Sequence, residues 1–134
     1  MSSDHAELCV GAVVVSDGRL LLVERGRGAG VGMWSIPGGR VELGETMEAA
    51  VRRELHEETG LEAISTRHLG HVERIGAGWH FLIHDFLVEV ACEEGLRAGD
   101  DASDARWIAL DELNDVQGIV PGLVEFLTVH GVLA

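Results

Sequence analysis

Three glutamates in one short segment are the residues best suited to chemistry. Glu54, Glu57 and Glu58 are spaced i, i+3 and i+4, so on a helix their carboxylates converge on one patch. Like charges at this spacing repel each other, and partial burial of a carboxylate costs desolvation free energy. A fully solvated helix face would tolerate such a cluster, and the spacing alone does not decide between that face and a functional site.

The residues around the cluster favour a functional site. Glu42 and Glu45 precede the predicted helix, and Pro37-Gly38-Gly39 forms a turn upstream whose backbone carbonyls can face inward. Convergent carboxylate and carbonyl oxygens, with few nitrogen or sulfur donors, are the ligands that hard divalent cations prefer. The pattern therefore predicts a Mg²⁺ site, with Mn²⁺ as a substitute.

The helix that positions these acids is predicted over residues 46–59. Thr46 is a suitable N-cap and Gly60 a natural stop, and the apolar side chains recur at helical spacing. The resulting apolar stripe consists of Met47, Ala50, Val51 and Leu55. Glu54 and Glu58 fall on or beside this stripe, whereas His56 lies away from it and is expected to face solvent.

The rest of the chain alternates between strand and loop patterns. The expected strands cover residues 8–15, 20–23, 64–72, 81–90 and 105–108. Asp17-Gly18 is typical of a hairpin turn, a Gly-containing turn is expected at 75–79, and 26–32 and 91–104 are predicted loops. A helical turn at 110–113 and a terminal helix at 121–130, with Pro121 near its first position, complete an α/β or α+β sandwich.

Composition limits the range of partners. The 134 residues suit a single domain over 1–134, and the net charge is −13 because 23 acidic residues face ten Arg and no Lys. Such a surface repels duplex nucleic acid and anionic membranes, but small anionic ligands remain possible where cations mediate the contact. Cys9 and Cys92, each flanked by apolar residues, are predicted to be buried free thiols.

The N-terminal residues show no signal-peptide pattern, and no apolar run approaches the roughly 20 residues needed to span a bilayer. Together with the predicted free thiols, these features lead us to expect a cytoplasmic protein.

Residues 39–61, GRVELGETMEAAVRRELHEETGL, resemble the signature of the Nudix (MutT-like) hydrolases. Every fixed position of that signature is matched, by Gly39, Glu45, Arg53, Glu54, Leu55, Glu57, Glu58, Gly60 and Leu61. The signature covers about a sixth of the chain, and the flanking Trp34 and Ala105-Arg106-Trp107 also resemble the family. The resemblance implies an α/β/α sandwich with a mixed β-sheet.

The resemblance also implies a reaction, the Mg²⁺-dependent hydrolysis of a phosphoanhydride bond in a nucleoside diphosphate linked to another group. By resemblance, the metal ligands are the carboxylates of Glu54, Glu57 and Glu58 together with the carbonyl of Gly38. A carboxylate then removes a proton from the attacking water.

By resemblance, the catalytic residues are Glu58, Glu54, Arg53 and Glu45. Glu58 or Glu54 is the general base, Arg53 orients the cluster, and Glu45 supports the site. Because the family places its base variably, Glu93 or Glu94 on the later loop stays an alternative.

Four residues are candidates for substrate binding. Arg25 and Arg27 flank the first predicted loop and could pair with phosphates, although loop arginines serve solubility equally well. Trp79 follows a Gly-rich turn and could stack on a base, and His80, which shares a strand face with His84, could line a cleft. Packing roles compete with both of these assignments, and Trp34 and Trp107 are expected to be packing residues.

The substrate is less well defined than the reaction. The chain has no Tyr and only Pro37 and Pro121, so it lacks the downstream Pro or Tyr that marks some subgroups of the family. These absences favour a (deoxy)nucleoside triphosphate, with ADP-ribose or a nucleotide sugar as the alternative. A non-catalytic nucleotide-sensing domain is a further alternative, the charge disfavours an RNA 5′-end substrate, and a homodimer stays open.

Overall fold

The structure, a computed structural model, describes residues 5–26, 31–99 and 101–133. Its first sheet has the strand order β5-β1-β7-β6. These strands are β1 (Glu7–Val13), β5 (Gly38–Arg40), β6 (Ala63–Gly76) and β7 (Trp79–Val90). Strand β1 pairs parallel with β7 and antiparallel with β5, so the sheet is mixed, as expected.

A second sheet forms around β3 (Arg19–Arg25). Its other strands are β2 (Val15–Ser16), β4 (Trp34–Ser35) and β8 (Ala102–Ala109). Strand β3 pairs antiparallel with all three of them. Only Val14 separates β1 from β2, so the chain passes directly from one sheet into the other.

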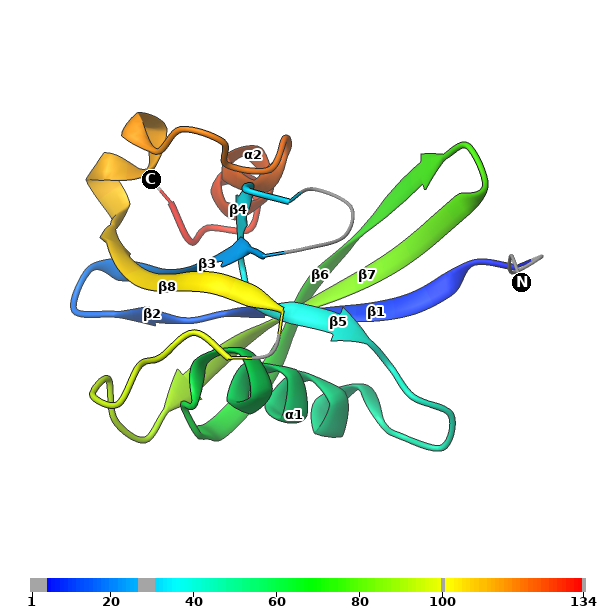
Figure 1. The fold of residues 1–134 in the computed structure, drawn as a ribbon, viewed down its shortest axis with the longest axis horizontal. Coiled ribbons are helices and arrows are strands. Elements are labelled where there is room, and N and C mark those ends of the chain that lie inside the picture. Colours follow the sequence, from blue (N-terminus) through cyan, green and yellow to red (C-terminus); the bar gives the residue numbers. More distant parts are fainter. Residues whose placement is uncertain (1–4, 27–30, 100, 134) are drawn as a thin grey trace.

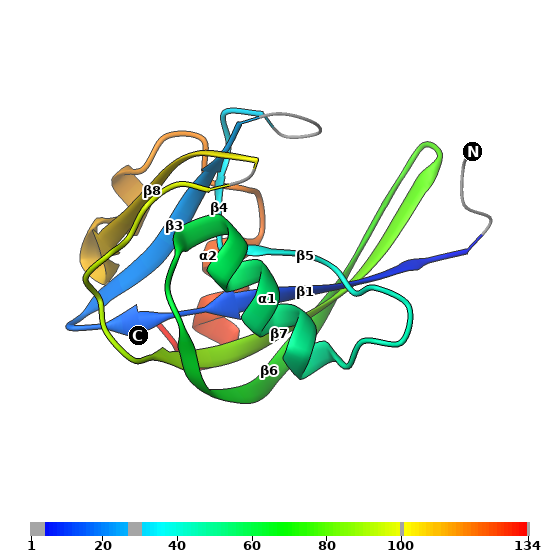
Figure 2. The ribbon, with the colours of Figure 1, turned by 60° about the horizontal axis from the view of Figure 1, so that its bottom comes forward.

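Two helices cover opposite sides of the strands (Figures 1 and 2). Helix α1 (Met47–Thr59) contributes Ala50, Val51 and Leu55 to one apolar cluster, and α2 (Leu123–Val129) contributes Leu123, Phe126 and Leu127 to another. A 3₁₀ helix, Leu110–Asp115, packs Leu113 into the second cluster. This is the predicted α/β/α arrangement with a mixed sheet. None of the helices in the described ranges is long and apolar enough to cross a membrane.

Helix α1 begins and ends as predicted because both signals are local. The Thr46 side chain accepts a hydrogen bond from the Ala49 N–H at 3.1 Å, and Gly60 has a φ of 76° that ends the helix. The Gly60 N–H donates to the carbonyl of His56, whose side chain is exposed as expected. The apolar stripe places Val51 and Leu55 in the core, which fixes the direction of the acidic side chains.

Several expectations about the remaining elements were wrong. Strands β6 and β7 pair up to Gly76 and Trp79, so the turn consists of Ala77 and Gly78 rather than 75–79. The positive φ of Gly78 allows this tight connection. Strand β8 begins at Ala102, within the predicted loop 91–104, and residues 27–30 of the loop predicted over 26–32 lie outside the described residues.

Two further expectations, the start of the terminal helix and the burial of Cys92, were also wrong. Helix α2 begins after Gly122, whose φ of 88° is left-handed, so Pro121 precedes the helix instead of occupying its first turn. Cys9 is buried as predicted, but Cys92 is exposed because it follows the end of β7, outside both apolar clusters.

Candidate active site

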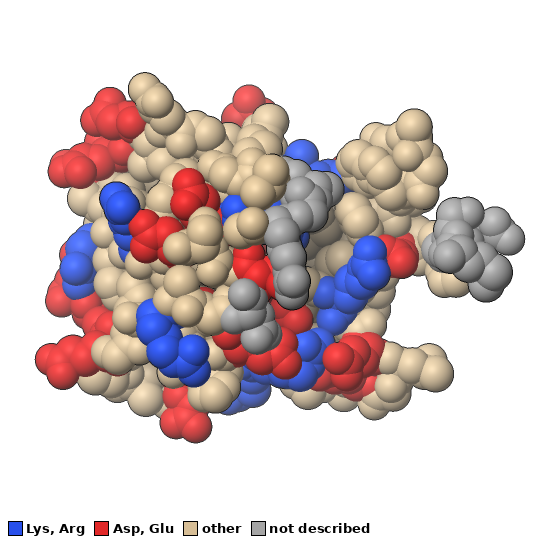
Figure 3. Space-filling view, in the orientation of Figure 1, with Lys and Arg blue, Asp and Glu red and all other residues tan. Residues whose placement is uncertain are grey.

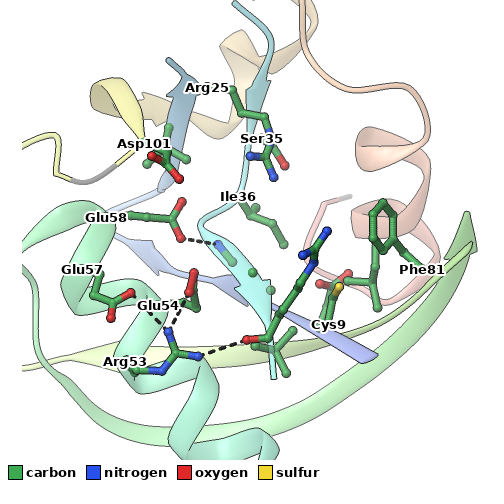
Figure 4. Close-up of a pocket in the computed structure, with 18 of the residues that line it drawn as sticks. Cys9, Arg25, Ser35, Ile36, Arg53, Glu54, Glu57, Glu58, Phe81 and Asp101 are labelled. Carbon is green, nitrogen blue, oxygen red and sulfur yellow. Dashed lines mark hydrogen bonds and ion pairs between the residues drawn. The ribbon is translucent and has the colours of Figure 1, made fainter. Parts of the chain in front are cut away.

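A cavity of about 840 Å³ lies where α1 and β5 approach the mixed sheet. Helix α1 and β5 contribute Gly38, Gly39, Glu54, Glu57 and Glu58 to its lining, and β1 and β7 contribute Cys9, Phe81, Ile83 and Asp85. Figure 4 shows the acids of α1 facing the cavity across from Cys9 and Phe81, with Arg25 and Asp101 on a third side. The structure therefore combines the predicted acidic cluster with apolar strand residues in one space.

Arg53 connects the acidic residues to one another. Its Nε and Nη2 donate to the two carboxylate oxygens of Glu45 at 2.7 and 2.9 Å. Its Nη1 donates to Glu54 at 2.8 Å and to Glu57 at 3.2 Å, and Nη2 also donates to the carbonyl of Arg40 at 3.0 Å. The planar guanidinium thus fixes the spacing between the loop before α1 and two successive turns of the helix.

The electrostatic effect of Arg53 is largest at Glu45. Hydrogen bonds from the guanidinium, and a weaker one from the backbone N–H of Glu42, lower the pKa of Glu45 to about 2. The same pairing raises the pKa of Arg53, so both groups are charged across the physiological range. Glu45 therefore serves as a counter-ion for Arg53, and it does not line the cavity.

Glu54 and Glu58 form a coupled pair of carboxyl groups. Burial raises the pKa of both, the negative charge of Glu54 raises the pKa of Glu58 further, and the two side chains share a hydrogen bond. The Gly38 N–H donates to Glu58 at 3.0 Å, which opposes this rise. Gly39 leaves room for the Glu54 side chain, because a Cβ at this position would lie 2.2 Å from a carboxylate oxygen of Glu54.

The donor chemistry of this cluster fits a hard divalent cation. Glu54, Glu57 and Glu58 offer only carboxylate oxygens. Burial first, and then the negative charge of Glu54, raise the pKa of Glu58, and a cation between the acids would offset this repulsion. As the side chains lie, however, Arg53 holds both Glu54 and Glu57. Within the part of the chain that the structure describes, no three His, Cys, Asp or Glu side chains are grouped so that they could hold a metal ion. Binding a cation would therefore require small side-chain rotations in the cluster.

The four predicted substrate-binding residues have different outcomes. Arg25 ends β3 and lines the cavity, where its charge weakly opposes the rise in the pKa of Glu58 that burial and the charge of Glu54 cause. Arg27 lies outside the described residues. Trp79 stacks on Phe81 near the tip of the β6–β7 hairpin, and His80 pairs with Glu73 at 2.7 Å. The structure places neither Trp79 nor His80 among the residues that line the cavity.

The alternative bases on the later loop are also remote from the cluster. Glu93 accepts hydrogen bonds from Ser16 and Arg19, which belong to the β2–β3 hairpin. Neither Glu93 nor Glu94 lines the cavity. The cavity is therefore lined by the acids of α1 and not by the alternative bases of the later loop.

Sequence reasoning missed the residues of the sheet that line the cavity. Cys9, Phe81, Ile83 and Asp85 meet because β1 and β7 pair in parallel, with Cys9 opposite Ile83 and Gly11 opposite Asp85. One signal was available, since Asp85 continues the alternation of Phe81 and Ile83 and so places an acid on an apolar strand face.

The surface charge agrees with the composition. Figure 3 shows Arg side chains as small separate areas among acidic ones, with acidic atoms gathered near the middle of the face. This face presents no broad basic surface for a nucleic-acid backbone.

Comparison with known proteins identifies one family. The profile of the NUDIX domain matches residues 6–128. The chain is 38% identical over 112 residues to the ADP-ribose pyrophosphatase of Methanocaldococcus jannaschii, and 36% identical over 101 residues to the oxidized purine nucleoside triphosphate hydrolase of Danio rerio. These matches cover 81% and 75% of this chain but only 65% of each relative, just under two thirds of its length.

A solved structure supports the same relationship over nearly the whole fold. The crystal structure of a MutT NUDIX hydrolase from Burkholderia pseudomallei is similar with a TM-score of 0.84 at 32% sequence identity. The similarity covers 93% of this chain and 98% of that one.

Proposed function

The chain belongs to the Nudix family, and from this premise we propose that it hydrolyses a phosphoanhydride bond in a small nucleoside diphosphate derivative with the help of a divalent cation. The observation that carries the proposal is the placement of Glu54, Glu57 and Glu58 along one side of a cavity of about 840 Å³. A cavity of this size accommodates a nucleotide.

The acids of α1 bind the cation and accept a proton in this proposal. Glu54, Glu57 and Glu58, with the carbonyl of Gly38, would hold Mg²⁺, and Mn²⁺ would substitute for it. When bound, the cation neutralises phosphate charge and lowers the pKa of water. Glu58 or Glu54 accepts the proton of the attacking water at a carboxylate oxygen.

The two arginines at the site act on different partners. Arg53 keeps Glu54 and Glu57 in place while Glu45 neutralises it, so it positions the acids without touching the substrate. Arg25 lines the cavity and offers its charge to substrate phosphates. This division leaves the reacting atoms to the carboxylates.

Two substrate classes are candidates. A (deoxy)nucleoside triphosphate agrees with the absence of subgroup markers and with the name of the Danio rerio relative. ADP-ribose is supported by the name of the Methanocaldococcus jannaschii relative. Both classes present a nucleoside diphosphate to the same cavity. The rates at which the protein hydrolyses members of each class distinguish them.

A substrate panel with purified protein tests the proposal. The panel contains deoxynucleoside triphosphates, oxidised dGTP, ADP-ribose, a nucleotide sugar and capped RNA, each with Mg²⁺ and with Mn²⁺, and products are separated by chromatography. We expect cleavage of at least one small nucleotide and none of capped RNA. The Glu58→Gln variant should lose about 10²- to 10⁴-fold in kcat.

The control variant is Glu62→Gln, which removes an exposed acid just beyond the helix and should leave kcat unchanged. If no nucleotide is cleaved with either metal while nucleotides still bind, the chain is a sensing domain and the proposed hydrolysis is wrong. Undiminished turnover by Glu58→Gln would remove Glu58 from the catalytic residues.

A further inference from the structure

Asp85 is a buried acid that lines the same cavity as the acidic cluster but lies on β7 instead of α1. Its side chain is only 5% exposed, and its Oδ1 has no hydrogen-bond partner in the described part of the chain. Thr59, also a buried polar side chain, both donates to the Leu55 carbonyl and accepts from the Leu61 N–H. Asp85 therefore has an unmet capacity to accept hydrogen bonds.

The strands on either side of β7 leave room for this carboxyl group. Asp85 lies opposite Gly11 on β1 and opposite Gly70 on β6. A Cβ at Gly11 would lie 2.2 Å from Oδ1 of Asp85, so a side chain there would displace the carboxyl group. Neither strand places a side chain directly opposite Asp85, although the ring of His130 fills the space beside Gly70, where a Cβ would lie 2.4 Å from it.

Asp85 is unfavourable for folding in this position. Burial raises its pKa to about 7, and the positive charge of Arg74 opposes the rise only in part. A buried polar atom without a partner destabilises a protein, and such a group beside a cavity is a candidate for ligand binding. The feature is explained if a ligand supplies the missing donor.

The surroundings of Asp85 indicate what that donor is attached to. Cys9, Ile36, Phe81 and Ile83 line the same cavity and present mainly apolar surface. Figure 4 shows Cys9 and Phe81 across the cavity from Glu57, with Ile36 between them and the acids. Phosphates belong on the acidic, cation-binding side, so the flat ring of a nucleobase fits the apolar side, where its amino group is a natural donor to a carboxyl oxygen.

We propose that Asp85 binds the amino group of a nucleobase, so that the cavity selects adenine, guanine or cytosine nucleotides over analogues that lack this group. The inference rests on the proposed function in one respect, that the cavity takes a nucleotide. It adds a residue that determines specificity, on an element separate from the acidic cluster.

The test is equilibrium binding of nucleoside monophosphates by calorimetry in the presence of Mg²⁺. These ligands have no phosphoanhydride bond, so no hydrolysis accompanies binding. Three matched pairs differ only by the amino group, namely AMP and purine riboside monophosphate, GMP and IMP, and CMP and its pyrimidin-2-one analogue. Wild type should prefer the amino member of at least one pair by about tenfold to a hundredfold, as expected for one hydrogen bond to a charged acceptor. Asp85→Leu, which keeps the branching at Cγ but is larger and has no acceptor, should reduce that ratio to about one.

Two further variants separate hydrogen bonding from structural effects. Asp85→Asn keeps an acceptor oxygen and should retain the preference for the amino member. Ile83→Leu, on the same strand face, should change the affinity of both members equally and leave their ratio unchanged. Asp85→Leu should melt at the same temperature as wild type or higher, because it removes an unpartnered buried carboxyl group.

Four results would overturn the inference. The first is no binding of any monophosphate, and the second is an affinity ratio near one for all three pairs in wild type. The third is an affinity ratio that Asp85→Leu leaves unchanged. The fourth is that Asp85→Leu changes the affinity for AMP relative to dAMP and not the ratio within the amino pairs. The last result would assign Asp85 to a ribose hydroxyl. Because binding is measured without turnover, a failure of the proposed hydrolysis in the substrate panel is distinguishable from a failure of this inference.

Discussion

Arg53 donates hydrogen bonds to three acidic side chains and one backbone carbonyl, whereas the neighbouring Arg52 donates to the carbonyl of Ala63. The two residues are adjacent in the sequence and identical in type, yet α1 turns one toward the acids and the other toward solvent. They form a matched pair for measuring how much the orientation of the cluster matters.

Arg53→Ala should lower kcat by about a hundredfold, because Glu54 and Glu57 lose the donor that positions them. Arg53→Lys should recover only part of this loss, since an ammonium group cannot form the paired hydrogen bonds to Glu45. Steady-state kinetics on the substrate found in the panel measures both effects. Arg52→Ala is the control, and an equal loss there would show that the helix as a whole, rather than the orientation of its acids, was affected.

The low pKa of Glu45 predicts how the stability of the folded protein depends on pH. Its folded-state pKa of about 2 lies below the ordinary value of 4.5, so its pairing with Arg53 stabilises the protein fully above pH 4.5. This stabilisation is lost as the pH falls through about 2. The difference in melting temperature between wild type and Glu45→Gln should therefore narrow from pH 5 toward pH 2.

A double-mutant comparison isolates this pair. In an Arg53→Ala background, Glu45→Gln should change the melting temperature by a smaller amount that no longer narrows in this pH range. A constant difference between wild type and Glu45→Gln at every pH would contradict the assignment.

At the scale of elements, the close approach of β5 to α1 sets the position of Glu54. The Glu54 carboxylate occupies the space that a Cβ at Gly39 would take, and the backbone N–H of Gly38 donates to Glu58. The Pro-Gly-Gly turn therefore acts on the acids through its backbone and through the absence of a side chain.

Gly39→Ala should lower kcat by about tenfold to a hundredfold with little change in melting temperature. The nearest obstacle to the new Cβ is the end of the Glu54 side chain, which can move without disturbing the backbone. The double variant Gly39→Ala with Glu54→Gln should be no slower than Glu54→Gln alone, because both changes act on the same carboxylate. Additive losses would show that Gly39 acts elsewhere.

The sequence was sufficient where the signals are local. Thr46 and Gly60 define α1, and the spacing of Glu54, Glu57 and Glu58 on that helix predicts their convergence. It was insufficient where residues meet through long-range pairing. Asp85 joins the cavity only because β7 lies parallel to β1, and the full length of the β6–β7 hairpin depends on cross-strand contacts that a five-residue turn pattern does not reveal.

For the whole molecule, a net charge of −13 makes cations the natural intermediaries for a phosphate ligand. Seven acidic residues against three Arg fall between residues 38 and 62, so this segment alone carries −4. The remaining charge is spread over the surface, where it favours solubility and opposes binding to large polyanions.

Mg²⁺ should therefore stabilise the folded chain. At a hundred times its dissociation constant, a ligand that binds only the folded state adds about 2.7 kcal/mol to the free energy of unfolding. Thermal melts should show a rise with Mg²⁺ that EDTA reverses and that Glu57→Gln reduces. Glu62→Gln should retain the full rise, and an equal rise with NaCl at matched ionic strength would indicate general screening instead of a site.

The two walls of the cavity belong to different parts of the fold, with the acids on α1 and the mainly apolar residues on β1 and β7. Cys9, Phe81 and Ile83 belong to strands and Glu54, Glu57 and Glu58 to a helix, so substitutions that keep the apolar pattern of the strands can change one wall while the acids stay in place. Under the proposed function, a lineage with this architecture can exchange one nucleotide for another through a few strand substitutions while the acids of α1 stay constant. Substrate diversity thus has a short evolutionary path in this fold.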